Sequence, residues 1–263
     1  MKIGKEIEFV DRCLLLNFNK KRTLVVGDLH LGKENLMLEQ GWSFPKTQLE
    51  KTIKIFNLIF KKIGNVDEII LLGDVKEFFG GILKDEFSDF WKVVNLLKKS
   101  LNKNGKIVIT KGNHDNILEP IVRNYDFVEL RDYYILSSEK EGILFLHGHK
   151  KGFENLKKEI VFYDKKIKTI VCGHFHPAIS IKDSGGVKKE NFKCFLFGKN
   201  KYFKKDFLVV PSFFPLVEGT NILINKKELS ENLNIKSFNI YVVFGDDKLQ
   251  VKKFGKVKDF LND

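Results

Sequence analysis

Five apolar runs along the chain each stop at a Gly-flanked polar cluster. Each run is rich in Val, Ile and Leu, spans only a few residues and is bounded by turn-forming residues, a pattern typical of buried strands. The sequence therefore predicts five strands, each followed by a polar turn. In chain order they read TLVVGDLH (23–30), EIILLGD (68–74), KIVITKGNHD (106–115), GILFLHGH (142–149) and KTIVCGHFH (168–176).

Two segments between these runs have the periodicity of helices. Residues 46–64, KTQLEKTIKIFNLIFKKIG, carry apolar side chains at helical spacing, and residues 87–101 repeat the pattern. Strands that alternate with helices predict an α/β fold. Ligands of such sheets bind beyond the carboxyl ends of the strands, so all five polar clusters are expected at the ligand-binding edge.

The rest of the chain is rich in strand signals. Residues 239–254, NIYVVFGDDKLQVKKF, predict a β-hairpin with a turn at Gly-Asp-Asp. Because no Pro/Ser-rich linker divides the chain, we expect a single domain over residues 1–263, with a Lys/aromatic-rich excursion at 183–206.

Composition indicates a globular protein rather than a disordered one. The chain has 263 residues, of which 43% are apolar and 30% charged, enough to bury a core. No apolar run approaches the roughly 18 residues of a membrane span, and the N-terminus lacks a signal-peptide pattern. We therefore expect a cytoplasmic protein with no membrane partner. Cys13, Cys172 and Cys194 form no CxxC pair and are expected to be buried and reduced.

The charge balance adds a hypothesis about partners. Lys and Arg number 46 against 34 Asp and Glu, which gives a net charge of +12. Such an excess favours polyanionic partners, with nucleic acid ahead of a membrane surface, although a lysine-rich genome would produce it too.

The histidines point to metal chemistry. All six lie in the polar clusters, at positions 30, 114, 147, 149, 174 and 176. The pairs Asp28/His30 and His174/His176 are spaced i, i+2, so an extended backbone would aim both members to one side, as suits two ligands of one site. Carboxylates, imidazoles and an amide oxygen, without a thiolate, suit Mn, Fe, Ni or Zn better than calcium.

The number of donors favours two metals that share a carboxylate. Two metals about 3.5–4 Å apart can hold a water between them as hydroxide and clamp a phosphate for displacement. The leaving oxygen needs a general acid, usually a histidine oriented by a carboxylate, and His114 with Asp115 fits that role. Five unrelated turns are the alternative interpretation of the same clusters.

The ordered motifs GDLH, GDVKE, GNHD, HGH and GHFH resemble those of the calcineurin-like metallophosphoesterases. The resemblance implies a four-layer α-β-β-α sandwich and a hydrolase with two divalent metals, Mn first, with Fe, Ni or Zn as alternatives. It also implies that His114 protonates the leaving group and that Asp115 orients it. The implied ligands are Asp28, His30, Asp74 and His176 for one metal, and Asp74, Asn113, His147 and His174 for the other.

A narrower resemblance concerns LVVGDLHLGKE, GWSFP, GHFHPA and PSFFPLVEGTN. These stretches are similar to a branch that includes DNA-ligase-associated, ICC-like phosphoesterases and archaeal relatives, which implies a phosphodiesterase or nuclease of DNA repair with a functional link to ligase or helicase. Two features depart from the pattern. Lys76 and Glu77 stand where many members have His or Asp, and Phe213-Phe214 where an asparagine is expected.

Three groups of residues outside the ligand set have two interpretations each. Residues 182–205 interleave lysines with aromatic residues, so they either bind single strands or ends of nucleic acid or form a hairpin with inward rings and solvated lysines. Lys33 and Glu34 either contact substrate or begin a helix. His149 either holds a substrate phosphate or hydrogen-bonds a metal ligand.

Three functions follow from these observations. The first is a metal-dependent phosphodiesterase or nuclease that acts on nucleic acid. The second is a phosphohydrolase of small nucleotides or other phosphoesters. The third is a scaffold that retains the fold without catalysis, and the complete set of motifs argues against it.

Overall fold

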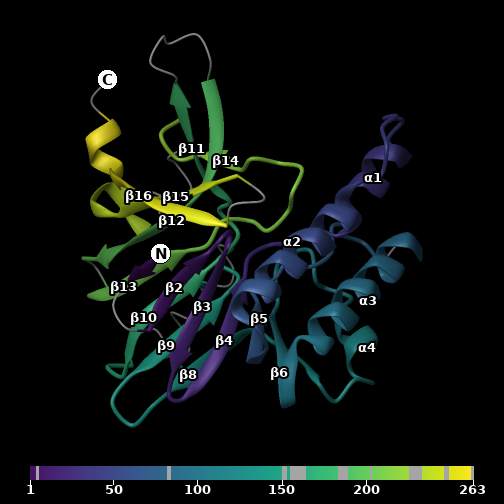
Figure 1. Ribbon diagram of the computed structural model, residues 1–263, viewed down its shortest axis with the longest axis horizontal. Helices are drawn as coiled ribbons and strands as arrows, with labels where there is room; N and C mark the ends of the chain where they lie inside the picture. The colour runs from purple at the N-terminus through teal and green to yellow at the C-terminus, as the bar shows by residue number, and fades with distance from the viewer. Residues whose placement is uncertain are drawn as a thin grey trace.

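Two β-sheets lie face to face in the computed structural model, with α-helices grouped against one of them (Figure 1). The structure describes residues 1–3, 6–81, 84–149, 153–154, 164–182, 189–201, 203–224, 233–245 and 249–261. This mixed α/β architecture of two sheets confirms the predicted fold class of the metallophosphoesterase type.

The first sheet has the strand order β1-β2-β3-β4-β5-β6-β7. Strands β1 to β4 pair antiparallel, while β4, β5, β6 and β7 pair parallel. Its strands are β1 (Lys2–Ile3), β2 (Ile7–Val10), β3 (Cys13–Phe18), β4 (Lys21–Val26), β5 (Val66–Leu71), β6 (Leu101–Thr110) and β7 (Val128–Arg131).

The second sheet has the order β14-β11-β12-β13-β10-β9-β8, and β15 joins it through β12. Strands β9, β10 and β13 are parallel, so this sheet too has a parallel centre. Its strands are β8 (Tyr133–Ser137), β9 (Gly142–Leu146), β10 (Ile167–Cys172), β11 (Pro177–Lys182), β12 (Lys189–Asn200), β13 (Lys205–Val209), β14 (Thr220–Asn221), β15 (Asn239–Phe244) and β16 (Gln250–Lys256).

The described α-helices lie on the side of the first sheet that faces away from the second, and most of them pack against it (Figure 1). They are α1 (Lys33–Glu39), α2 (Gln48–Ile63), α3 (Lys84–Lys99) and α4 (Glu119–Val122). The helix predicted at 46–64 matches α2, which buries Ile55, Phe56 and Ile59 against the sheet. The helix predicted at 87–101 begins earlier and gives Leu101 to β6. In the described part, the 3-10 helices η2 (Ile235–Ser237) and η3 (Val257–Phe260) cover the second sheet.

The facing sides of the two sheets form a shared apolar core. Phe9 of β2 stacks on Phe195 of β12 with ring centroids 4.4 Å apart, and Val25, Ile70, Phe145 and Leu208 are buried in the same cluster. Burial of this apolar surface fixes the register of the two sheets, since a one-residue slip would expose every inward side chain.

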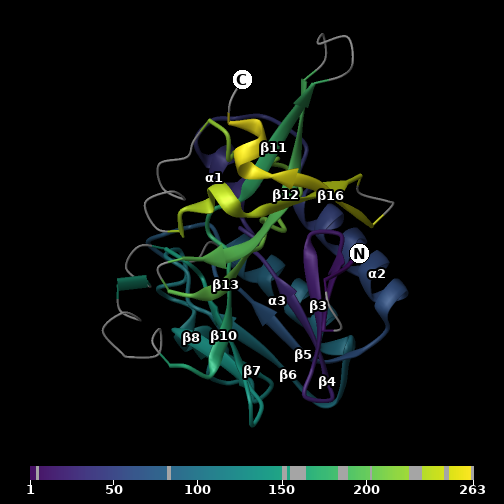
Figure 2. The same cartoon turned by 90° about the vertical axis from the view of Figure 1, so that its left-hand side faces the viewer.

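The segment expected as an excursion at 183–206 is largely part of the second sheet. β12 pairs with β11, β13 and β15, and its residues Cys194, Phe195 and Leu196 are fully buried. Only its first residues, with β11, extend beyond the sheet as an arm (Figure 2). Residues 183–188 lie outside the described residues. The expectation was wrong because lysines mask the apolar alternation of a central strand. β15 and β16 pair antiparallel where the hairpin was predicted.

Two further expectations concern membranes and cysteines. No helix among the described residues is long and apolar enough to cross a membrane. All three cysteines are free and buried, and burial raises the pKa of the Cys172 and Cys194 thiols.

Gly27 shows how tightly the strand-end turns approach one another. A Cβ on Gly27 would lie 2.3 Å from the carbonyl oxygen of Pro211, a backbone atom that follows β13 in the other sheet. We predict that Gly27→Ala lowers the free energy of unfolding by about 1–3 kcal/mol in urea titrations, because the two turns must separate. Gly80→Ala is the control: its Cβ would meet only a ring carbon 3.9 Å away, and a change within about 0.5 kcal/mol is expected. Equal stabilities would contradict the close approach.

Candidate metal centre

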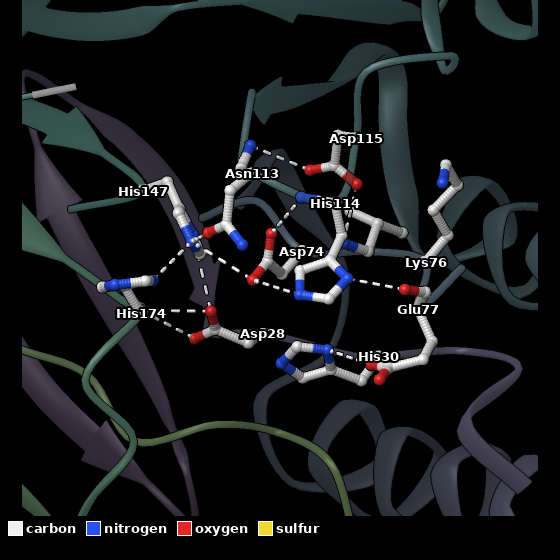
Figure 3. Close-up of polar contacts among 12 residues, drawn as sticks. Asp28, His30, Asp74, Lys76, Glu77, Asn113, His114, Asp115, His147 and His174 are labelled. Atoms are coloured by element: carbon white, nitrogen blue, oxygen red, sulfur yellow. Dashed lines mark hydrogen bonds and ion pairs between the residues drawn. The ribbon is translucent and has the colours of Figure 1, made fainter. Parts of the chain in front are cut away.

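The polar clusters meet at one edge of the fold, where parallel strands of both sheets end. β4, β5 and β6 of the first sheet deliver Asp28, Asp74 and Asn113, and β9 and β10 of the second deliver His147 and His174 (Figure 3). The five strands predicted from the sequence are all present at the expected positions. The structure therefore brings together side chains from five separate loops.

One group of donors surrounds Nε2 of His147. That nitrogen lies 3.0 Å from Nδ1 of His174, 3.1 Å from Oδ1 of Asn113 and 3.3 Å from Oδ2 of Asp74. These four residues are the set expected for one metal, and the Asp74, His147 and His174 donors lie close enough to share an ion. We refer to them as the Asp74 group.

A second group contains Asp28, His30 and His176. Nε2 of His176 lies 3.4 Å from Oδ1 of Asp28 and 3.2 Å from Nε2 of His30, so these donors also face a common point. We refer to them as the Asp28 group. The two groups are adjacent, since Nδ1 of His147 lies 3.4 Å from Oδ1 of Asp28.

Hydrogen bonds orient two of these imidazoles. Nδ1 of His147 donates to the carbonyl of Leu72 (2.7 Å), and Nδ1 of His30 donates to Oε2 of Glu77 (2.7 Å). With the proton at Nδ1, the Nε2 lone pair of each ring faces its group, as a metal ligand requires.

The carboxylates and imidazoles shift one another's pKa values. Burial disfavours the charge on Asp28, yet the imidazoles of His176, His147 and His30 hold its pKa well below the usual range. Burial likewise opposes a charged His147, but Asp74 and Asp28 raise its pKa to about 9. The centre is thus a buried site whose carboxylates are stabilised in the charged form by positive neighbours, a part that a bound cation can also play.

The backbone at the centre differs from the extended geometry expected. His30, Asp74, His174 and His176 all have positive φ, between 44° and 67°. The i, i+2 pairs therefore reach the centre through left-handed turns and not through strand alternation. His174 and His176 enter different groups, as in the ligand sets that the family resemblance implies, while Asp28 and His30 lie in one group.

His114 lies beside both groups. Its Nε2 is 3.9 Å from Oδ2 of Asp74, and its ring meets the ring of His30 edge-on at 5.4 Å. Nδ1 of His114 donates to the backbone carbonyl of Glu77 at 2.5 Å, which leaves Nε2 directed at the centre. Its side chain is 21% exposed and so can reach a substrate.

Asp115 does not orient His114, which corrects the expected pairing. Its carboxylate instead accepts from the backbone N–H groups of Gly112 (2.9 Å) and Val75 (3.1 Å), which ties the loop after β6 to the loop after β5. Burial raises the pKa of Asp115, and the nearby Asp74 raises it further. The carboxylate next in sequence to a histidine was a natural candidate, but the loop turns it inward.

Glu77 had no predicted role and was noted only as a departure from the family pattern. Its carboxylate binds Nδ1 of His30 and the ammonium of Lys33, and its carbonyl binds His114. The only signal in the sequence was a carboxylate three residues after the shared Asp74. Lys76 is buried and donates to the carbonyl of Phe78.

Lys33 and Glu34 have structural roles at helix termini. Lys33 begins α1, and the carboxylate of Glu34 accepts from the backbone N–H groups of Thr47 and Gln48 at the start of α2. An acidic side chain at a helix N-terminus also complements the helix dipole. These contacts support the helix interpretation of both residues.

His149 lies next to the Asp74 group. Its ring centroid is 5.4 Å from that of His147 and 6.2 Å from that of His174. The prediction that it contacts substrate or a ligand remains a prediction.

The lysine-rich segment contributes less to a binding surface than its composition indicated. Nζ of Lys193 donates to the carbonyls of Ser212 and Phe214, and Nζ of Lys205 donates to those of Asp164 and Ile167. Phe195 is fully buried. The exposed lysines of the described part include Lys189, Lys199, Lys201 and Lys204. This pattern supports inward aromatics with a partly solvated lysine face.

The donors fit two divalent cations. Imidazole nitrogens face one another at 3.0 Å and 3.2 Å with carboxylate oxygens beside them, an arrangement that a cation held in common would stabilise. The residues expected as ligands lie in these two groups, with Asp74 beside His147 and His174 only, and a third set of possible donors joins His30 to Glu77 and His114. Asp74 has one oxygen directed at the Asp74 group, while Oδ1 accepts from the backbone N–H of His114 at 3.0 Å.

A two-sheet α/β fold with such a centre at its strand ends defines a metal-dependent hydrolase. The sequence profile of the family described as calcineurin-like phosphoesterase matches residues 21–247, so the chain belongs to that family. The protein is thus a metal-dependent phosphoesterase of a family that uses divalent metals.

The chain also matches solved structures at low identity. A protein of unknown function from Aquifex aeolicus is 21% identical (TM-score 0.39; 59% of this chain and 78% of that one). The E. coli phosphoesterase YfcE is 13% identical (TM-score 0.42; 89% and 98%). A novel archaeal phosphodiesterase is 14% identical (TM-score 0.35; 89% and 98%). No match to a curated protein was found.

We predict that the metal-free protein binds two equivalents of Mn²⁺ in calorimetric titration and that the ligand variants separate the two groups. His174→Ala should weaken binding of one equivalent by more than about tenfold, since loss of an outer hydrogen-bond partner alone costs 10–100-fold. Asp74→Asn should weaken both, because Asp74 is the expected shared ligand. Glu129→Gln, which removes a carboxylate on β7 outside both groups, is the control and should retain both. Two unchanged equivalents in His174→Ala would contradict the assignment.

Proposed function

We propose that this phosphoesterase is a phosphodiesterase or nuclease that acts on nucleic acid, with Mn²⁺ as its metal and a role in DNA repair or processing. The observation that carries the proposal is the position of His114, whose Nε2 lies 3.9 Å from Asp74 beside two groups of metal donors. A proton donor next to a dinuclear centre suits cleavage of an ester whose leaving oxygen needs a proton.

The residues of this chain have separate parts in the reaction. Bound metals would supply Lewis acidity toward phosphate oxygens and toward water. Asp28, Asp74, Asn113 and the ligand histidines would hold them. His114, fixed through Nδ1 by the Glu77 carbonyl, would donate the proton of Nε2 to the leaving oxygen.

Phe79 supports a nucleic-acid substrate. The residue is 53% exposed, and its ring meets that of His114 edge-on, with centroids 4.9 Å apart. An exposed ring on the leaving-group side is positioned to stack on a base next to the scissile phosphate, a contact that favours unpaired bases. Together with the net charge of +12, it favours single strands or ends as substrate. The narrower sequence resemblance supports repair and a link to ligase or helicase.

One observation favours a second candidate, hydrolysis of small nucleotides or other phosphoesters. Lys193 and Lys205 of the expected binding segment donate to backbone carbonyls. A free nucleotide would need only the centre and Phe79, and none of the distant lysines.

The His114→Ala variant should bind its metals like the parent protein but hydrolyse substrate more slowly. We expect Mn²⁺ content by elemental analysis to match the parent protein, because the imidazole is not in the predicted ligand set, while turnover of a phosphodiester with a poor leaving group falls by about 10²–10⁴-fold. Substrates whose leaving group needs no proton, such as nitrophenyl esters, should be affected less. Full activity of His114→Ala on the poor leaving group would contradict the acid assignment.

Oligonucleotides that lack a base test the substrate class. We predict that Mn²⁺-loaded protein cleaves single-stranded DNA and that affinity falls steeply with salt. Phe79→Ala should raise KM for an intact strand while leaving KM for a strand with an abasic site next to the cleaved bond unchanged. Trp42→Ala, which removes another exposed ring in the α1–α2 connection, is the control. Turnover confined to free nucleotides would reject the nucleic-acid proposal.

A further inference from the structure

Glu77 joins elements that each contribute to the centre. Its Oε2 accepts from Nδ1 of His30 at 2.7 Å, and its Oε1 accepts from the ammonium of Lys33. The side chain of Glu77 is 6% exposed, so the carboxylate itself is buried. Burial disfavours the charged form, yet His30 and Lys33 lower the pKa of Glu77, which keeps it ionised.

The backbone of Glu77 is itself held in place. Its N–H donates to the carbonyl of Leu31 (2.9 Å) and to Oε1 of Glu86 (2.7 Å), a fully buried residue in the first turn of α3. Oε1 of Glu86 also accepts from the N–H of Phe78 (2.8 Å). α3 therefore fixes the loop that carries Glu77.

We propose that Glu77, neutralised by Lys33, is a positioning residue for the Asp28 group and acts through His30. The inference rests on the proposed metal centre but not on a nucleic-acid substrate. An acceptor on Nδ1 fixes the tautomer of His30, directs Nε2 at Asp28 and His176, and makes the imidazole a stronger ligand. Lys33 matters because a buried carboxylate without a counter-charge next to Asp28 and Asp74 would be costly.

The pairing links metal binding to the first helix. Lys33 is the first residue of α1, and Gln48 at the start of α2 donates from Nε2 to the carbonyl of His30 (2.6 Å). The side chain of His30 is thus held by Glu77 and its main chain by α2. A shift of α1 or α2 would therefore act on His30 of the Asp28 group through both contacts.

Calorimetric titration of the metal-free full chain with Mn²⁺ tests the proposal. Glu77→Ala should weaken one of the two equivalents by about 10–100-fold and leave the other unchanged. Glu77→Gln should recover most of that loss, because its amide oxygen still accepts from His30. The control is Glu129→Gln, which likewise removes a carboxylate paired with a lysine, Lys106 at 2.8 Å, but on β7.

Two outcomes would overturn the proposal. One is a Glu77→Ala protein that binds both equivalents like the parent protein, whatever its melting temperature. The other is a Glu77→Gln protein as weak as Glu77→Ala, which would indicate packing alone. Should Glu77→Ala fail to fold, Lys33→Ala replaces it: this side chain is 35% exposed, and the same equivalent should weaken in the same direction. Because the measurement uses no substrate, failure of the nucleic-acid proposal would leave this result unaffected.

Discussion

The strand-end loops of the two sheets are joined by Asp28, which is fully buried at the end of β4. We refer to these contacts as the joint between the sheets. Its carboxylate accepts from the backbone N–H of His174 in the loop after β10, and its carbonyl accepts from the N–H groups of Phe213 (2.8 Å) and Phe214 (3.1 Å) after β13. One residue of the first sheet therefore fixes two loops of the second. A buried carboxylate is stable only with such donors and positive neighbours, so the joint and the metal centre are one structure.

The ligands reach this joint in backbone conformations that cost energy. A left-handed conformation is uncommon for a residue with a Cβ, and here His30, Asp74, His174 and His176 all adopt it. Hydrogen bonds between the loops offset that cost: the N–H groups of Leu29 and His30 both donate to the carbonyl of Asp74. The apolar core between the sheets supplies the stability that keeps these loops together.

The features that could be predicted from the sequence are those set by local patterns of apolar and polar residues. The five strands and α2 follow from apolar runs and helical spacing, and the donors lie at the ends of those strands because each motif is contiguous with its strand. Contacts between distant segments could not be predicted in this way. Asp115 was paired with His114 because they are neighbours in sequence, whereas the real acceptor is the carbonyl of Glu77, brought there by α3. Likewise, β12 looked like a surface segment because its lysines are conspicuous, while its burial depends on β13 and β15.

The position of Glu77 also bears on where substrate specificity can arise. Dinuclear centres of this kind act on the phosphate, which all phosphoesters share, so the ligands do not select among substrates. Residues next to the leaving group can select among substrates. Phe79 lies in the loop that carries Glu77, and His114 is positioned by that loop because it donates to the carbonyl of Glu77. The loop after β5 thus contributes Asp74 of the Asp74 group, the support of His30 and His114, and an exposed ring. Changes of substrate class within this fold are therefore expected to arise in this loop before they arise among the metal ligands.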